Sequence, residues 1–137
     1  MRRVFADTFY YLALLNEADA AHRRAVEFSR AFDGQMVTTA WVLTELADGL
    51  AQPDNRPVFL RLWRALNGDP DVTIVPADSS WFEAGVRLYE QRPDKAWTLT
   101  DCISFAVMER ERILEAATGD RHFEQAGFEA LLRSPSG

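Results

Sequence analysis

The fold is decided by residues 98–108, which read Thr98-Leu99-Thr100-Asp101-Cys102-Ile103-Ser104-Phe105-Ala106-Val107-Met108. Every residue from Cys102 to Met108 is apolar except Ser104, and a helix that is apolar on nearly all sides belongs in a core. Yet Asp101 stands at the start of this helix, with Ser104 one turn later on the same face. Because a buried carboxylate is costly unless it is hydrogen-bonded, paired or bound to a metal, the stretch predicts a buried helix whose first turn needs a partner.

The composition indicates a soluble protein of one domain, residues 1–137, with a frayed tail at 134–137. The single cysteine cannot form an internal disulfide, which favours a reducing cytoplasm. No stretch approaches the roughly 18 apolar residues of a membrane span, so no membrane association is expected. The net charge of -6 argues against binding nucleic acid by bulk electrostatics. It does not exclude acids gathered around a metal, because a bound ion reverses the local sign.

Short apolar segments alternate with helical patterns along the chain. Strands are predicted at residues 4–6, 35–38, 72–75, 115–118 and 128–132. Helices are predicted at residues 9–15, 19–32, 40–51, 58–66 and 79–91, from Thr98 onward, and from 120 to 127. This alternation predicts an α/β fold, in which helices cover both faces of a mostly parallel sheet of four to five strands.

Four acids are predicted to meet at one edge of that sheet. Asp7 ends the first strand, Asp120 follows the fourth, and Glu45 and Asp101 lie on helices entered from the same edge. Ligands of such sheets bind at the carboxyl ends of the strands. Taken singly, Asp7, Asp101 and Asp120 are explained as helix caps and Glu45 as the partner of an arginine. Taken together, the four would repel one another unless they share protons or a cation.

A site of oxygen ligands suits Mg²⁺ or Mn²⁺. The two histidines, His22 and His122, are expected at the surface, with a place near the acids as the alternative for His122, which closely follows Asp120. So few possible ligands disfavour a zinc site of histidine and cysteine. Carboxylates with Mg²⁺ bind phosphate oxygens and activate water, which is the chemistry of phosphodiester hydrolysis. Thr8 and Thr118 flank two of the acids, where they either orient a carboxylate or a metal-bound water or satisfy the local backbone.

These segments resemble the PIN-domain family, especially the VapC-type toxins of toxin–antitoxin pairs, over residues up to about Leu132. The motifs are Val4-Phe5-Ala6-Asp7-Thr8, Thr44-Glu45-Leu46, Leu99-Thr100-Asp101-Cys102-Ile103-Ser104-Phe105 and Thr118-Gly119-Asp120-Arg121-His122-Phe123. The resemblance implies a three-layer α/β/α sandwich, a homodimer and an antitoxin protein that occupies the site. It also implies a Mg²⁺- or Mn²⁺-dependent endoribonuclease of RNA, with Asp7, Glu45, Asp101 and Asp120 as the catalytic, metal-binding acids.

Several side chains are candidates for binding RNA or the antitoxin. Arg110, Arg112 and Arg121 stand near the motifs, where they either contact phosphates or form a solvated charged face. Trp97, in a predicted loop, is a candidate for stacking on a base. The apolar stripe within residues 58–66 either packs in the core or lines a groove for an antitoxin segment.

Three other functions fit parts of the pattern. One is a PIN-like nuclease of RNA processing that is not a toxin. Another is a non-catalytic, Mg²⁺-binding switch like a receiver domain, although Lys95, before the central helix, is badly placed for the lysine of that fold. The last is a degenerate module that only binds a partner.

Overall fold

The computed structural model describes residues 1–134 and contains a five-stranded sheet. The strands are β1 (Arg3–Ala6), β2 (Gln35–Thr39), β3 (Val72–Val75), β4 (Glu115–Ala117) and β5 (Glu129–Ala130). They lie in the order β3-β2-β1-β4-β5, and every neighbouring pair is parallel. The predicted parallel sheet is therefore confirmed, while the predicted tail, apart from Ser134, lies outside the described residues.

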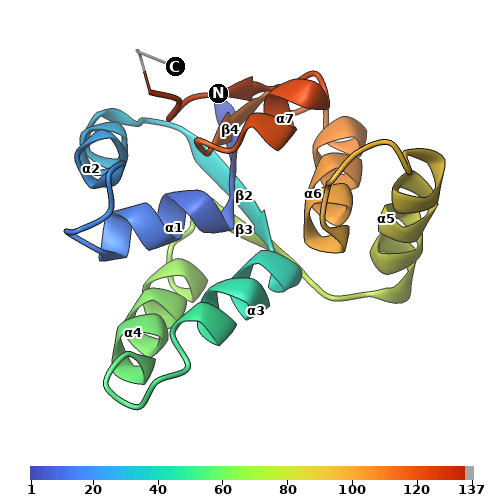
Figure 1. Ribbon diagram of the computed structural model, residues 1–137. Coiled ribbons are helices and arrows are strands. Elements are labelled where there is room, and N and C mark those ends of the chain that lie inside the picture. Colours follow the sequence, from blue (N-terminus) through green and yellow to red (C-terminus); the bar gives the residue numbers. More distant parts are fainter. Residues whose placement is uncertain (135–137) are drawn as a thin grey trace.

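Helices cover both faces of the sheet, as the three-layer prediction required (Figure 1). They are α1 (Thr8–Leu15), α2 (His22–Ala31), α3 (Ala40–Gly49), α4 (Arg56–Asn67), α5 (Ser79–Gln91), α6 (Leu99–Arg110) and α7 (Arg121–Gln125). After β1, the chain adds β2 and then β3 on one side of that strand. It then crosses back and adds β4 and β5 on the other side of β1. Because crossovers between parallel strands are right-handed, α1 to α4 cover one face and α5 to α7 the other.

Several predicted elements are longer than the observed ones, among them those at 19–32 and 128–132. The helix predicted from residue 19 begins at His22, because the Asp19 side chain accepts a hydrogen bond from the backbone of Ala21 at 2.8 Å and holds a turn there. The strand predicted at 128–132 is only Glu129–Ala130, since its partner β4 has just three residues. Neither difference changes the order of the elements.

The central helix α6 is buried on nearly all sides, as its sequence predicted. One side of α6 packs into the main core through Phe105 and Met108. The other side meets α5 where Gly85 lies against Ile103, and a Cβ added at Gly85 would lie 2.3 Å from the Ile103 Cγ1 atom. Glycine therefore lets two helices approach closely and completes the burial of α6.

The strand order places a topological switch between β1 and β4. From these two neighbours the chain leaves in opposite directions, and in parallel sheets the carboxyl ends at such a point form the ligand crevice. Asp7 directly follows β1, and Thr118 directly follows β4. Within residues 1–134, no helix combines the length and hydropathy that crossing a membrane requires.

Candidate metal centre

Asp7 lies at the base of the crevice, where β1 turns into α1. It is 5 % exposed, and its backbone N–H donates to the carbonyl of Ala117 at 3.4 Å. Although Asp7 is the N-cap residue of α1, its side chain makes no capping hydrogen bond. Its Oδ2 atom instead accepts a hydrogen bond from the hydroxyl of Thr118 at 2.8 Å. The carboxylate of Asp7 is thus fixed mainly by the residue that follows the neighbouring strand β4, and the backbone of Thr8 adds a weaker interaction.

Asp101 enters the crevice from the first turn of α6. A capping box holds this turn: the backbone N–H of Asp101 donates to Thr98 Oγ1 at 3.0 Å, and the N–H of Thr98 donates to Asp101 Oδ2 at 3.1 Å. The cap fixes the rotamer of a carboxylate that is 8 % exposed. Asp101 therefore has the predicted capping role, and the capped rotamer also directs it toward the crevice.

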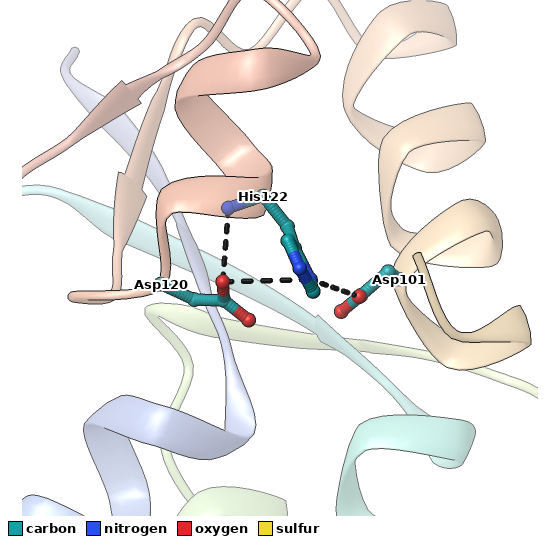
Figure 2. A group of neighbouring side chains, drawn as sticks. All are labelled: Asp101, Asp120 and His122. Atoms are coloured by element: carbon teal, nitrogen blue, oxygen red, sulfur yellow. Dashed lines mark hydrogen bonds and ion pairs between the residues drawn. The ribbon is translucent and has the colours of Figure 1, made fainter. Parts of the chain in front are cut away.

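Asp120 enters from the loop between β4 and α7. Its backbone N–H donates to Thr118 Oγ1 at 3.1 Å, and its Oδ1 atom accepts from the N–H of His122 at 2.9 Å. The His122 Nδ1 atom then lies 3.1 Å from Asp101 Oδ2 and 3.5 Å from Asp120 Oδ1. Figure 2 shows the imidazole between the two carboxylates. Asp101, Asp120 and His122 each offer a ligand atom, and these atoms lie within 4.8 Å of one another.

The acids of the crevice disfavour one another's charge. Burial raises the pKa of Asp7 to about 7, and the charges of Asp101 and Asp120 add to this effect against the hydrogen bond from Thr118. Burial also raises the pKa of Asp101, and Asp120 adds to it, while the Thr98 N–H and His122 oppose the change. Among residues 1–134, His122 is the one basic side chain in an ion pair with these carboxylates. The crevice is therefore short of positive charge.

A divalent cation fits this arrangement. Asp101 and Asp120 offer carboxylate oxygens to one group of possible ligands, and Asp7 lies outside that group but near enough for the charges of both acids to act on it. None of the three has a guanidinium or ammonium partner among the described residues, and a hard dication prefers carboxylate oxygens. The hydroxyl of Thr8, beside Asp7, is buried and has no hydrogen-bond partner, so an unsatisfied oxygen lies next to one of the acids. The imidazole of His122 adds a nitrogen ligand, so the site also suits divalent transition metals such as Mn²⁺.

The surface position favoured for His122 is wrong, and the alternative position near the acids is the observed one. Its side chain is 22 % exposed and faces the acids. The signal was the spacing Asp120-x-His122: the capped first turn of α7 ties the His122 backbone to the Asp120 carboxylate and so places the imidazole beside it.

The structure does not bring Glu45 into contact with the other acids. Glu45 lies on the exposed face of α3 and has no hydrogen bond or ion pair with any described residue. Its helix does begin at the same edge of the sheet, directly after β2, where Thr39 caps it through the N–H of Val42. The edge was predicted correctly, but the side chain of Glu45 points to solvent, because Leu43 and Leu46 occupy the buried face.

Two of the predicted RNA contacts, Arg110 and Arg112, lie away from the crevice, and a third, Trp97, is buried. Arg110 is nine residues beyond Asp101, or about 14 Å along the axis of α6, and its guanidinium lies 4.3 Å from the centre of the Trp81 ring. Arg112 follows at the same far end with a φ of 56°. Trp97 is only 5 % exposed, and its Nε1 atom donates to Gln125 Oε1, so the expectation that it stacks on bases was wrong. Arg121 is exposed and stands beside the centre, at the start of α7.

Comparisons with known proteins agree with this architecture. Residues 4–129 match the family model of the PIN domain. VapC20 of Mycobacterium tuberculosis, a toxin described as cleaving the sarcin–ricin loop, is 24% identical, with a TM-score of 0.83 over 91% of this chain and 95% of that chain. A toxin–antitoxin complex from Klebsiella pneumoniae is 19% identical (TM-score 0.63, 86% and 87% covered), and FitAcB from Neisseria gonorrhoeae is 20% identical (0.65, 93% and 94%). No curated protein matches the sequence.

Proposed function

Because this chain belongs to the PIN-domain family, we propose that it is a Mg²⁺- or Mn²⁺-dependent endoribonuclease, the toxin of a type II toxin–antitoxin pair. The observation that carries the proposal is the cluster of Asp101, Asp120 and His122 at the switch between β1 and β4, with the buried Asp7 near enough for the charges of both acids to act on it. Among residues 1–134, His122 is the one basic partner of Asp101 and Asp120. Such a cluster has little structural use without a cation, since each acid raises the cost of ionising the next.

Each residue has a role in this proposal. Asp7, Asp101 and Asp120 would hold the ion, and Glu45 is the fourth acid that the resemblance implies. When bound, a divalent ion polarises a phosphate oxygen and lowers the pKa of a water molecule. Thr118 orients the carboxylate of Asp7 and the backbone of Asp120 with a single hydroxyl. Thr8 has an unpaired hydroxyl beside Asp7, and Arg121 is an exposed cation for the RNA backbone.

The test is a cleavage assay on purified protein with structured and single-stranded RNA in Mg²⁺ and Mn²⁺. Asp101→Asn is expected to lower cleavage at least 100-fold, because it removes a ligand charge while an amide can still cap α6. Glu109→Gln is the matched control, since Glu109 is an exposed acid near the far end of the same helix. Circular dichroism checks that both variants fold. Absence of cleavage by the wild type, or equal activity of the two variants, would refute the nuclease.

The partner proposed is an antitoxin protein, which the solved complex from Klebsiella pneumoniae has. An apolar cavity of about 700 Å³ lies between α3 and α4, with Leu60 43% and Trp63 38% exposed. The stripe within residues 58–66 therefore packs on the core through Phe59, Leu62 and Leu66 and also leaves an open apolar wall. A wall of this kind suits an apolar antitoxin segment.

Expression in a bacterial host separates a toxin from an RNA-processing nuclease. A toxin arrests growth, and co-expression of the small protein encoded beside it restores growth. A processing nuclease of the same chemistry cuts RNA in vitro without such arrest. The proposed homodimer is tested on the same preparation by light scattering, and the cytoplasmic location by cell fractionation.

A further inference from the structure

A second cavity, distinct from the apolar one, lies directly beside the metal centre. It is an open cavity of about 1020 Å³ lined by the end of α5, the loop after it and the first residue of α6. Its wall includes Tyr89, Lys95, Trp97 and Thr98, and one acid, Glu90. We call it the Tyr89–Lys95 hollow. Its size is at the upper end of the range of pockets that hold small ligands, so one nucleotide fits within it.

Thr98 joins the hollow to the metal centre. This residue lines the hollow, and its backbone N–H and its hydroxyl both hydrogen-bond to Asp101. The same residue therefore lines the hollow and contacts Asp101, a proposed metal ligand. A strand of RNA whose phosphate lies at the acids would pass its neighbouring nucleotide along this wall.

Lys95 supplies a cation that is weakly engaged within the protein. Arg92, the other cation of the wall, forms two hydrogen bonds to Asp94 at 3.0 Å and lies over the Trp97 ring at 5.2 Å. Asp94 is thereby neutralised, and the Lys95 Nζ atom stands 3.9 Å from it, with the side chain 28% exposed. Lys95, the only lysine of the chain, has room to bind a phosphate in the hollow.

Tyr89 supplies an aromatic surface at the rim. Its side chain is 55% exposed, although aromatic residues usually bury themselves. The floor of the hollow is rigid, because Trp97 packs edge-on against Phe105 and donates to Gln125. An exposed ring, a cation and a firm floor are the elements with which proteins hold an unpaired base and its phosphate.

Two of the other cavities lack this combination. The apolar cavity between α3 and α4 has no charged side chain in its lining. A cavity of about 300 Å³ beside Tyr10 contains the acids Asp33, Asp69 and Asp71 and lies where β2 and β3 begin, at the opposite edge of the sheet. We propose that the Tyr89–Lys95 hollow binds one unpaired nucleotide of the RNA substrate beside the cleaved bond, with the base on Tyr89 and a phosphate on Lys95. This proposal rests on the ribonuclease function above.

The test compares Tyr89→Ala, Lys95→Ala and the conservative Tyr89→Phe with Phe82→Ala. Phe82 is a matched control, since it lies on the same helix and is 43% exposed but does not line the hollow. Binding of a fluorescent single-stranded RNA is measured by anisotropy, and cleavage by steady-state kinetics. The two alanine variants at Tyr89 and Lys95 are expected to weaken binding and raise KM about 10-fold with kcat within about twofold. Phe82→Ala is expected to match the wild type, and Tyr89→Phe, which keeps the ring, is expected to restore most of the binding that Tyr89→Ala loses.

Salt dependence tests the lysine on its own. Loss of one phosphate contact lowers the slope of log affinity against log salt by about 0.7 for a single strand, which Lys95→Ala should show and Tyr89→Ala should not. Normal constants in all variants of an active nuclease would overturn the hollow and leave the nuclease intact. RNA that binds through Tyr89 and Lys95 but is never cut would support the hollow and overturn the nuclease. RNA that is neither bound nor cut would overturn the hollow and the nuclease together. A dimer that Tyr89→Ala and Phe82→Ala both dissociate would assign the face to a second copy and overturn the inference.

Discussion

Asp7 makes stability depend on pH in a direction that is unusual for an acid. Its pKa rises from 3.8 to about 7 on folding, because it is buried next to Asp101 and Asp120. The unfolded chain therefore releases this proton near pH 4, whereas the folded protein keeps it until about pH 7. Stability falls as pH rises through this window, and the loss is complete above pH 7. One pKa unit corresponds to about 1.4 kcal/mol, so the full loss approaches about 4 kcal/mol.

Asp7→Asn removes this penalty, because an amide is neutral at every pH and its oxygen can still accept from Thr118. Urea unfolding of metal-free protein, measured at steps from pH 4 to pH 8.5, compares the variant with the wild type. We expect the variant to lose little stability at pH 4 and to become the more stable protein above pH 7, by up to about 4 kcal/mol. Asp48→Asn is the control, since Asp48 is an exposed acid on α3.

Added metal should raise the stability of the wild type relative to Asp7→Asn, opposite to the change expected without metal above pH 7. An ion that binds only the folded wild type adds about 2.7 kcal/mol of stability at 100 times its Kd, and Asp7→Asn should gain far less. The reasoning is refuted if the difference between wild type and Asp7→Asn stays constant from pH 4 to pH 8.5, as it should for Asp48→Asn. It is refuted equally if Mn²⁺ stabilises both proteins alike.

Three further predictions concern the supports of the centre. Thr118→Val should lower Mn²⁺ affinity 10- to 100-fold by calorimetry, because it frees the Asp7 carboxylate and raises the pKa of that group further; unchanged affinity would deny Thr118 its orienting role. Gly85→Ala should reduce the free energy of unfolding by about 1–3 kcal/mol, because the new Cβ meets Ile103. Gly49→Ala, whose Cβ meets nothing closer than 4.0 Å, should not destabilise the protein. Glu45→Gln should leave metal-free stability within about 0.5 kcal/mol of the wild type, since Glu45 is exposed, yet should weaken Mn²⁺ binding if the ion recruits its carboxylate.

Much of the fold could be predicted because local patterns agreed with the tertiary structure. The run from Cys102 to Met108 is apolar on all sides, and the structure buries it between the core and α5. The edge of the sheet followed from the same logic, since residues that end parallel strands share one rim. This placed Asp7 and Asp120 together although they stand at opposite ends of the sequence.

What the sequence could not predict depends on which way side chains face. Glu45 shares the edge but lies on the solvent side of α3, a difference of helical phase. Arg110 is close to the motif in sequence, yet the rise of a helix carries it to the other end of α6. Trp97 stands in a loop, where exposure is the usual expectation, but Phe105 and Gln125 hold it inside.

The hydrogen bond from Thr118 to Asp7 joins residues 111 positions apart. During synthesis the Asp7 carboxylate therefore has no Thr118 hydroxyl to hold it until residue 118 has been added to the chain. A fragment that ends before residue 118 lacks this bond and also lacks Asp120 and His122. The first acid of the centre is thus translated early, but the groups that fix and surround it are translated more than a hundred residues later.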